Sequence, residues 1–390
     1  MSRVRTVFAS LGYVWTSLGI AAAVIALAEG AYVGQLALRA RIFGSDDVRE
    51  AQAPGHPYAG QDWYRSFLDA REAAREKYDP WRSYWAYATT SPYLTVDADG
   101  YRVTPQPVAP AAAARRIFLL GGSAMWGYTS RDTETIPAHL ARRLAQAGLH
   151  DVALVNLAQP GYTIGHEIAA LQYELARGRR PALAIFYDGI NDIRTAQLYG
   201  APGHAFFEQR FGRLFEVESG RGFFASMLAP LERSRLAARL VQAMGGPNPW
   251  AIKARTPEVC PALGRYMADS ARSVSGLGQA WGFDTLFVQQ PHHASTAKRL
   301  TAFEATFMTP DDEMTWAGEC ATAIDTAMAG TNLAHRSYGR LFDTTTDTVF
   351  LDRFGHVTEA ANDRIAEALA GEVLARLTPA ASSPAPPPSR

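Results

Sequence analysis

From residue 115 onwards, short apolar runs alternate with stretches whose apolar residues recur at helical spacing. The apolar runs predict buried strands over residues 117–120, 152–155, 182–187 and 283–289, and a short last strand over 349–351. The helical spacing predicts helices over residues 135–147, 164–177 and 359–377. Strands that alternate with helices are typical of a parallel sheet covered by helices on both faces.

Residues 195–258 break this alternation with Gly and Pro punctuation. We expect an insertion there, near the carboxyl edge of the sheet, where ligands of such folds bind. The chain then divides into residues 1–42, an extension over 43–114 and an α/β domain over 115–378. The Pro-, Ala- and Ser-rich tail over 379–390 is predicted to be disordered.

The N-terminus decides the expected compartment. Arg3 and Arg5 precede an uncharged run over residues 6–28, which as a helix would be about 34 Å long and would cross a bilayer core of about 30 Å. A cleaved signal peptide, with Ala26 and Ala28 at the cleavage site, is the alternative, but its apolar region would be unusually long. We favour an uncleaved, single-pass inner-membrane anchor that partners the membrane. The early arginines predict a cytoplasmic N-terminus and a periplasmic folded part.

The extension over residues 43–114 is rich in aromatic side chains. They are Tyr58, Trp63, Tyr64, Tyr78, Trp81, Tyr84, Trp85, Tyr87, Tyr93 and Tyr101. Aromatic platforms can bind sugars, but aromatic residues more often pack an extension onto a core. We favour packing over a glycan-binding surface.

Charge and cysteine content exclude several classes of protein. Lys and Arg together number 38, as do Asp and Glu, so no basic face is indicated and we expect no nucleic-acid partner. Two cysteines exclude a disulfide-rich scaffold and a multi-cysteine metal cluster. In an oxidising space, Cys260 and Cys320 would form either a disulfide, which we favour, or two unrelated buried thiols.

The first chemical candidate is Ser123, which follows the first predicted strand through Gly121 and Gly122. A serine at the carboxyl end of a parallel strand presents its hydroxyl at the sheet edge, and its N–H opens the next helix. A phosphate-binding turn is the alternative, but neither the Walker pattern nor the dinucleotide pattern is present. The simplest alternative is a serine that caps a helix.

Two further strands end in polar segments at the same edge. Gly161 follows the second strand and offers an unobstructed backbone N–H, and Asn191 follows the third strand and offers a side-chain amide. Both could donate to an oxyanion, although Gly and Asn are also ordinary turn residues.

Near the C-terminus, Asp352 and His356 follow the last predicted strand. A neutral histidine is the usual base for a serine, and an aspartate can fix its tautomer. His292 and His293 are rival bases because they also follow a strand, and His139, on a helix, is expected to be structural.

Together these segments resemble the SGNH/GDSL hydrolase superfamily over about residues 115–378. The resemblance implies a three-layer α/β/α, flavodoxin-like domain with Ser123 as nucleophile and His356 as base. It also implies an oxyanion hole built from the N–H groups of Ser123 and Gly161 and the side chain of Asn191. The extension looks like that of membrane-anchored bacterial members.

Two departures from the family pattern stand out. Gly122 replaces the usual Asp of the Gly-Asp-Ser motif, and Asp352 lies four rather than three residues before His356. The second departure leaves the third triad member open between Asp352, Asp347 and a backbone carbonyl, or a Ser–His dyad.

The leading functional hypothesis is a serine esterase outside the cytoplasm, acting on an acyl ester of a glycan or lipid. An O-acyltransferase on a cell-surface polysaccharide would use the same residues. A non-catalytic anchored assembly or glycan-binding subunit is the third hypothesis. We expect no cofactor and no metal, because the pairs His292-His293 and Asp311-Asp312 are adjacent and lack further ligands.

Overall fold

The computed structural model describes residues 16–17, 19–35, 55–109, 112–206, 208, 236, 252–253, 255–308 and 311–378. The chain separates into two compact units, residues 1–52 with 207–251, and residues 53–206 with 252–390. In the first unit, residues 19–35 form a helix. Among the described residues, no helix combines the length and apolar character that a membrane crossing requires. Residues 6–15 and 18 of the expected anchor, and the expected tail over 379–390, lie outside the described residues.

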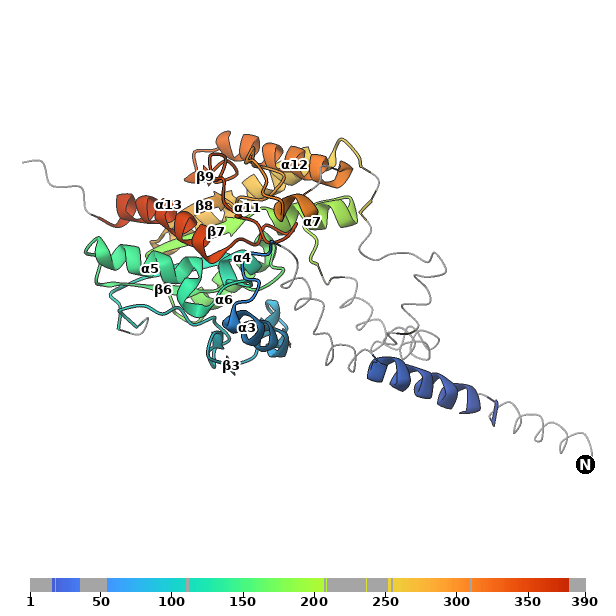
Figure 1. Cartoon of the computed structure of the whole chain (residues 1–390). Coiled ribbons are helices and arrows are strands. Elements are labelled where there is room, and N and C mark those ends of the chain that lie inside the picture. The colour runs from blue at the N-terminus through green and yellow to red at the C-terminus, as the bar shows by residue number, and fades with distance from the viewer. Residues whose placement is uncertain are drawn as a thin grey trace, which may run out of the picture. The chain divides into compact units, whose positions relative to one another are not determined.

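A five-stranded parallel sheet forms the centre of the second unit (Figure 1). Its strands are β5 (Arg115–Gly121), β6 (Val152–Asn156), β7 (Leu183–Asp188), β8 (Asp284–Gln289) and β9 (His335–Ser337). They run in the order β6-β5-β7-β8-β9, and every pair is parallel. This order is flavodoxin-like, so the chain reverses direction across the sheet between β6 and β7, on either side of β5. Ligands of such sheets bind outside the carboxyl ends of the strands at that reversal.

Two groups of helices complete a three-layer α/β/α domain. Helices α5 (Ile136–Gln146) and α13 (Glu359–Leu377) pack against each other. The other group packs together and against the strands; it consists of α6 (Ile164–Ala176), α7 (Ile190–Tyr199), α11 (Val259–Trp281) and α12 (Asp312–Ala329). The strands read as continuous apolar runs because both sheet faces are covered, and Leu119, Ile185 and Phe186 are fully buried.

The predicted last strand over residues 349–351 is wrong. The fifth strand is β9, and Phe350 forms only an isolated antiparallel bridge with Val357. The search for apolar runs missed β9 because this edge strand has only three residues, and its side chains are polar and at least partly exposed. Val349 and Phe350 are apolar for a different reason, since they bury the start of the loop that carries His356.

The predicted insertion also begins too early. Helix α7 continues to Tyr199 and ends at Gly200, whose φ of +75° allows a left-handed cap. The boundary at residue 195 therefore falls inside a buried helix. Residues 207, 209–235 and 237–251 lie outside the described residues.

The extension packs onto the α/β domain. It contains α3 (Asp62–Ala73) and the short strands β1 (Glu76–Asp79), β2 (Ser83–Ala86), β3 (Thr89–Thr90) and β4 (Thr95–Val96). The Tyr84 hydroxyl donates to the Pro160 carbonyl at 2.7 Å, and the Tyr101 hydroxyl donates to Glu174. Trp85 is buried, whereas Tyr78, Trp81 and Tyr87 are exposed. The expected packing role is therefore met by most, but not all, of the aromatic residues.

Cys260 on α11 and Cys320 on α12 form a disulfide, with their Cα atoms 4.3 Å apart. The bond joins two helices that already pack closely. Of the two alternatives open in the sequence, the structure contains the disulfide.

Candidate active site

Ser123 lies where the sequence places it, at the carboxyl end of β5 and the start of the short helix α4 (Ser123–Trp126). Two glycines bring the chain out of the strand. A Cβ atom at Gly121 would lie 2.9 Å from the Tyr187 carbonyl oxygen and 2.8 Å from the Met125 Cβ. Only glycine fits there, so the neighbouring strand β7 and helix α4 approach closely enough to present a half-buried Ser123 at the sheet edge.

His356 joins Ser123 to Asp352. Its Nε2 lies 2.7 Å from the Ser123 hydroxyl, and its Nδ1 is hydrogen-bonded to an Asp352 carboxylate oxygen. A carboxylate accepts only, so Nδ1 carries the proton in this contact and Nε2 is left to accept from the serine. The three side chains therefore form the arrangement in which a neutral imidazole can take the hydroxyl proton.

The unusual four-residue spacing is accommodated by Gly355. Its φ of +76° is left-handed, and a Cβ there would also lie 3.0 Å from Gln290 Nε2 and 3.4 Å from the Pro291 carbonyl oxygen. The Asp352 carboxylate accepts from the backbone N–H groups of Phe354 at 2.8 Å and of His356 at 3.3 Å. The extra residue thus lies in a tight turn around the Asp352 carboxylate, and this turn brings the His356 imidazole back into contact with that carboxylate.

The same contacts set the charge of Asp352. Burial alone raises the pKa of this carboxyl, but attraction to His356 and the hydrogen bonds from His356 and Phe354 outweigh it. The net result is a pKa below the usual range for aspartate. The side chain is one-third exposed, so the cost of burying its charge is limited. Asp352 is therefore an anion at neutral pH and can stabilise an imidazolium.

Asn191 and the Gly161-Tyr162 turn, which carry the expected oxyanion donors, are joined by a hydrogen bond. The Asn191 Nδ2 donates to the Tyr162 carbonyl at 2.7 Å. A Cβ atom built on Gly122 would lie only 2.2 Å from that Nδ2 and 3.4 Å from the Tyr162 oxygen. The amide of Asn191 therefore lies directly against the residue that precedes Ser123. Gly161, with φ +78°, sits in the adjoining turn and requires the left-handed conformation that glycine permits.

The glycine at position 122 also has a structural reason. Its φ of −86° and ψ of −154° are open to other residues, so conformation does not demand glycine. Space does, because any side chain would occupy the place of the Asn191 amide.

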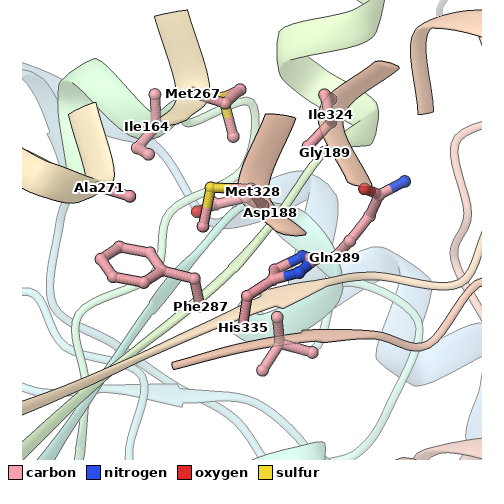
Figure 2. A pocket seen from close by; sticks show the side chains of 11 residues that line it. Ile164, Asp188, Gly189, Met267, Ala271, Phe287, Gln289, Ile324, Met328 and His335 are labelled. Carbon is pink, nitrogen blue, oxygen red and sulfur yellow. The ribbon is translucent and has the colours of Figure 1, made fainter. Parts of the chain in front are cut away.

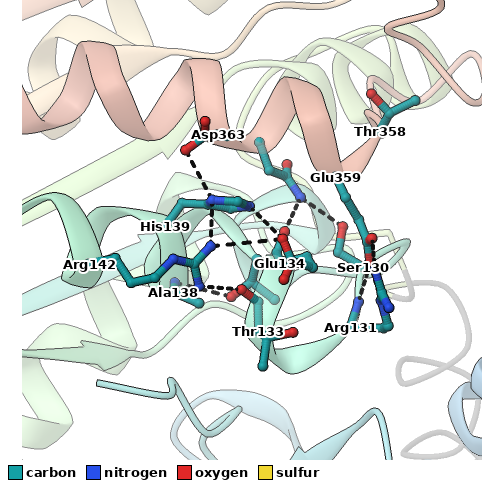
Figure 3. Close-up of polar contacts among 12 residues, drawn as sticks. Ser130, Arg131, Thr133, Glu134, Ala138, His139, Arg142, Thr358, Glu359 and Asp363 are labelled. Carbon is teal, nitrogen blue, oxygen red and sulfur yellow. Dashed lines mark hydrogen bonds and ion pairs between the residues drawn. The ribbon is translucent and has the colours of Figure 1, made fainter. Parts of the chain in front are cut away.

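Within the described residues, none of the rival candidates makes the hydrogen bond to the Ser123 hydroxyl, which His356 Nε2 makes. His292 and His293 are buried, and burial lowers their pKa to about 3 and about 4, which keeps both neutral. Asp347 is exposed and makes none of the His356 hydrogen bonds within the described part of the chain. His139 lies between Glu134 and Asp363, with ring-nitrogen to carboxylate distances of 3.2 and 3.0 Å, in a network that joins α5 to α13 (Figure 3).

Both ends of the loop that carries His356 are fixed. At its start, the buried Glu304 accepts from the N–H groups of Val349 at 2.9 Å and Phe350 at 3.1 Å. At its end, the Thr358 hydroxyl caps α13, and Glu359 forms a two-pronged ion pair with Arg131 (Figure 3). The loop is therefore held where an imidazole must stay aligned with Ser123.

A buried cluster of three carboxyls has no counterpart in the sequence predictions. It comprises Glu167, Asp188 and Asp192, each buried. The Glu167 and Asp188 carboxyls hydrogen-bond to each other, and one oxygen of Asp192 lacks a hydrogen-bond partner within the described residues. Burial raises the pKa of all three, and their mutual repulsion raises those of Glu167 and Asp192 further. The described residues hold no group of side chains with metal-binding geometry.

The Asp188 carboxyl lines a cavity of about 20 Å³, room for one water molecule, beside Gln289, His335 and apolar side chains (Figure 2). The cluster could not be recognised from the sequence, because Asp188 and Asp192 look like turn residues and Glu167 like a helix-surface residue. Asp192 does have one clear task, since it accepts from the Ile164 N–H at 3.2 Å and ties α6 to α7.

No protein-family model and no curated protein matches the chain. Among solved structures, it is similar to the acetyl xylan esterase AlAXEase, with 9% identity, a TM-score of 0.40, and coverage of 66% of this chain and 99% of that one. It is also similar to the lipase/acylhydrolase from Enterococcus faecalis (15% identity, TM-score 0.40, 68% and 98% covered). A third similar structure is a member of the lipolytic protein G-D-S-L family from Veillonella parvula. It has 13% identity and a TM-score of 0.38, and the match covers 68% of this chain and 100% of that one. Similarity at these scores carries no argument for activity, so the case for activity rests on the site geometry.

Proposed function

We propose that this protein is an ester hydrolase that works through an acyl-serine intermediate on Ser123. The observation that carries the proposal is the single imidazole of His356, in contact with the Ser123 hydroxyl through one nitrogen and with Asp352 through the other.

In the first half-reaction the Ser123 oxygen attacks the ester carbonyl, and His356 Nε2 accepts the hydroxyl proton. The resulting imidazolium is stabilised by the Asp352 carboxylate. The same Nε2–H then protonates the leaving alcohol as the carbon–oxygen bond of the tetrahedral intermediate breaks. A short Ser–His contact at the start favours this sequence, because the proton moves along an existing hydrogen bond.

The negative charge on the carbonyl oxygen is received by the N–H groups of Ser123 and Gly161 and by the Asn191 amide. Each such donor contributes about 3 kcal/mol to stabilising the transition state. In the second half-reaction a water molecule attacks the acyl carbon while His356 Nε2 takes its proton. The imidazolium then returns this proton to the Ser123 oxygen as the acyl–oxygen bond breaks and the acid leaves.

An O-acyltransferase would differ only in the acceptor, a sugar hydroxyl in place of water. No described contact favours that acceptor, so hydrolysis is our proposal. The complete set of Ser–His–Asp contacts argues against the non-catalytic alternative. A protein without catalytic activity would not need to keep all three side chains aligned.

We further propose an extracytoplasmic location for the catalytic unit. The uncharged run over residues 6–28 and the Cys260–Cys320 disulfide support it, because disulfides persist in oxidising compartments. Protease added to intact spheroplasts should digest the catalytic unit, and full protection of the chain would contradict the proposal.

The functional test is turnover of p-nitrophenyl esters of increasing acyl length by the full chain. Wild type should hydrolyse at least one ester, and Ser123→Ala should reduce kcat by about 10³-fold or more. Ser273→Ala, which changes an exposed serine on α11, serves as the matched control and should be neutral. Equal turnover by wild type and Ser123→Ala would refute the proposal. Adding an oligosaccharide and analysing the products separates hydrolysis from transfer.

A further inference from the structure

The loop after α4 lies against the catalytic histidine. The ring of Tyr128 stacks on the His356 imidazole, with centroids 5.0 Å apart and planes 24° from parallel. The neighbouring Thr129 hydroxyl donates to the carbonyl of Val357 at 3.0 Å. One short segment therefore touches both the imidazole and the backbone that follows it.

This segment is held by two arginines of the N-terminal extension. Arg102, fully buried, donates to the carbonyls of Gly127 at 2.7 Å and Ser130 at 2.8 Å, on either side of Tyr128. Its Nε also pairs with Asp132 at 2.8 Å. Arg71 on α3 donates to the Tyr128 carbonyl at 3.2 Å, and its guanidinium carbon lies 4.2 Å from the centre of the Tyr128 ring.

These contacts have two consequences for an imidazole that works as a base. A stacked ring restricts rotation of His356 about its side-chain bonds, so Nε2 stays aimed at Ser123 through both proton transfers. The face of an aromatic ring also attracts a cation, so Tyr128 favours the imidazolium that forms when the serine is deprotonated. Arg71 is a permanent cation over the same ring and competes for that attraction.

We propose that Tyr128 is a positioning residue for His356, and that the extension, through Arg71 and Arg102, is an integral part of the catalytic site. This inference rests on the proposed function. The extension then does more than cover the core. Arg71 and Arg102, the two cations that hold the loop carrying Tyr128, both precede the α/β domain.

The chain supplies matched controls. Tyr162 stacks on His166 with centroids 4.8 Å apart, far along the chain from the triad histidine, and serves as an internal reference pair. Arg82 is an equally buried guanidinium of the extension, which lies 4.0 Å from the centre of the Tyr173 ring rather than over Tyr128. Arg82→Met therefore loosens the extension without altering the Tyr128 contacts.

The test uses the full chain in five forms: wild type, Tyr128→Phe, Tyr128→Leu, Arg71→Met and Arg82→Met. The first readout is the NMR shift of the His356 ring protons, which is independent of activity. Loss of the aromatic ring in Tyr128→Leu should move them downfield, and Tyr128→Phe should leave them in place. The His166 protons should not move in Tyr128→Phe, Tyr128→Leu or Arg71→Met.

The second readout is the rate of Ser123 labelling by a fluorophosphonate across pH. Tyr128→Leu should label about tenfold more slowly than wild type, and Tyr128→Phe should stay within about twofold. The acidic limb of the profile should move to lower pH in Tyr128→Leu and to higher pH in Arg71→Met, because one variant removes an attraction for the imidazolium and the other removes a competitor. A merely structural loosening does not produce opposite shifts.

The inference is overturned if the His356 ring protons of Tyr128→Leu coincide with those of wild type. It is equally overturned if Arg82→Met changes the profile as much as Arg71→Met does. A wild type that shows the stacked His356 signal but accepts no label would refute the proposed function instead, so the two failures are distinguishable.

Discussion

Replacing Gly122 by alanine should inactivate the site while leaving the fold intact. The backbone at position 122 has φ −86° and ψ −154°, so an alanine is not strained there. Its Cβ would, however, lie 2.2 Å from Asn191 Nδ2, well inside van der Waals contact. The amide must move by about 1 Å or more to restore an ordinary contact, and its 2.7 Å hydrogen bond to the Tyr162 carbonyl would be lost.

The expected magnitude follows from what Asn191 does in the proposed mechanism. Removing one oxyanion donor lowers kcat by about 10²- to 10³-fold, or about 3 kcal/mol. Gly122→Ala should therefore lose this much in kcat on an aryl ester, with little change in KM. The unfolding midpoint should shift modestly, because the displaced group is at the end of a side chain.

A double-mutant cycle isolates the clash. Asn191→Ala alone should cost about the same as Gly122→Ala, and adding Gly122→Ala to Asn191→Ala should cost little more, since the obstructed amide is gone. Gly276→Ala on α11 is the control, because a Cβ there meets nothing within 4 Å. Full activity of Gly122→Ala, or equal losses in both backgrounds, would show that the Asn191 amide is not displaced by a side chain at position 122.

Three further predictions concern charge and cross-links. Asp352→Asn should lower kcat by about 10⁴-fold at neutral pH in ester hydrolysis, since the imidazole loses the anion that fixes its tautomer, and a loss below tenfold would point to a Ser–His dyad. Folding raises the pKa values of the buried carboxyls, to about 6 for Asp188. The folded state therefore holds more protons than the unfolded state, and the free energy of unfolding is highest in acid and falls as pH rises through the folded pKa. Urea midpoints should therefore fall less between pH 5 and pH 8 in Glu167→Gln than in wild type, and an equal fall would contradict the assignment. The double variant Cys260→Ser/Cys320→Ser should lose about 2–4 kcal/mol of unfolding free energy in urea, with kcat retained.

Periodicity was sufficient for most of the fold. Covered parallel strands must read as short apolar runs, so β5, β6, β7 and β8 could all be located within one or two residues. The same logic failed for β9, because an exposed edge strand of three residues carries no apolar run. It failed again at residues 349–351, where apolar residues bury a loop and not a strand.

The residue types of the candidate site could be predicted from the sequence, but the contacts that hold these residues in place could not. A parallel sheet brings the ends of its strands to one edge, so Ser123 and Asn191 could be grouped from order alone. His356 was grouped with them through a predicted strand over residues 349–351 that does not form, and it reaches the site from a loop. Whether Asp352 reaches His356 depended on a left-handed Gly355, which spacing does not reveal. Tyr128 stacks on His356, and Arg71 and Arg102 donate hydrogen bonds to the loop that carries Tyr128. These are tertiary contacts between segments far apart in the chain, for which a single sequence carries no signal.

The most direct test of the central claim is the intact mass of the full chain after exposure to a fluorophosphonate. Wild type, Ser123→Ala, His356→Ala and Ser273→Ala would be compared under the same conditions. We expect one adduct on wild type and on Ser273→Ala, mapped to Ser123, and none on Ser123→Ala or His356→Ala. A folded wild type that takes no adduct, or an adduct that persists in Ser123→Ala, would contradict it.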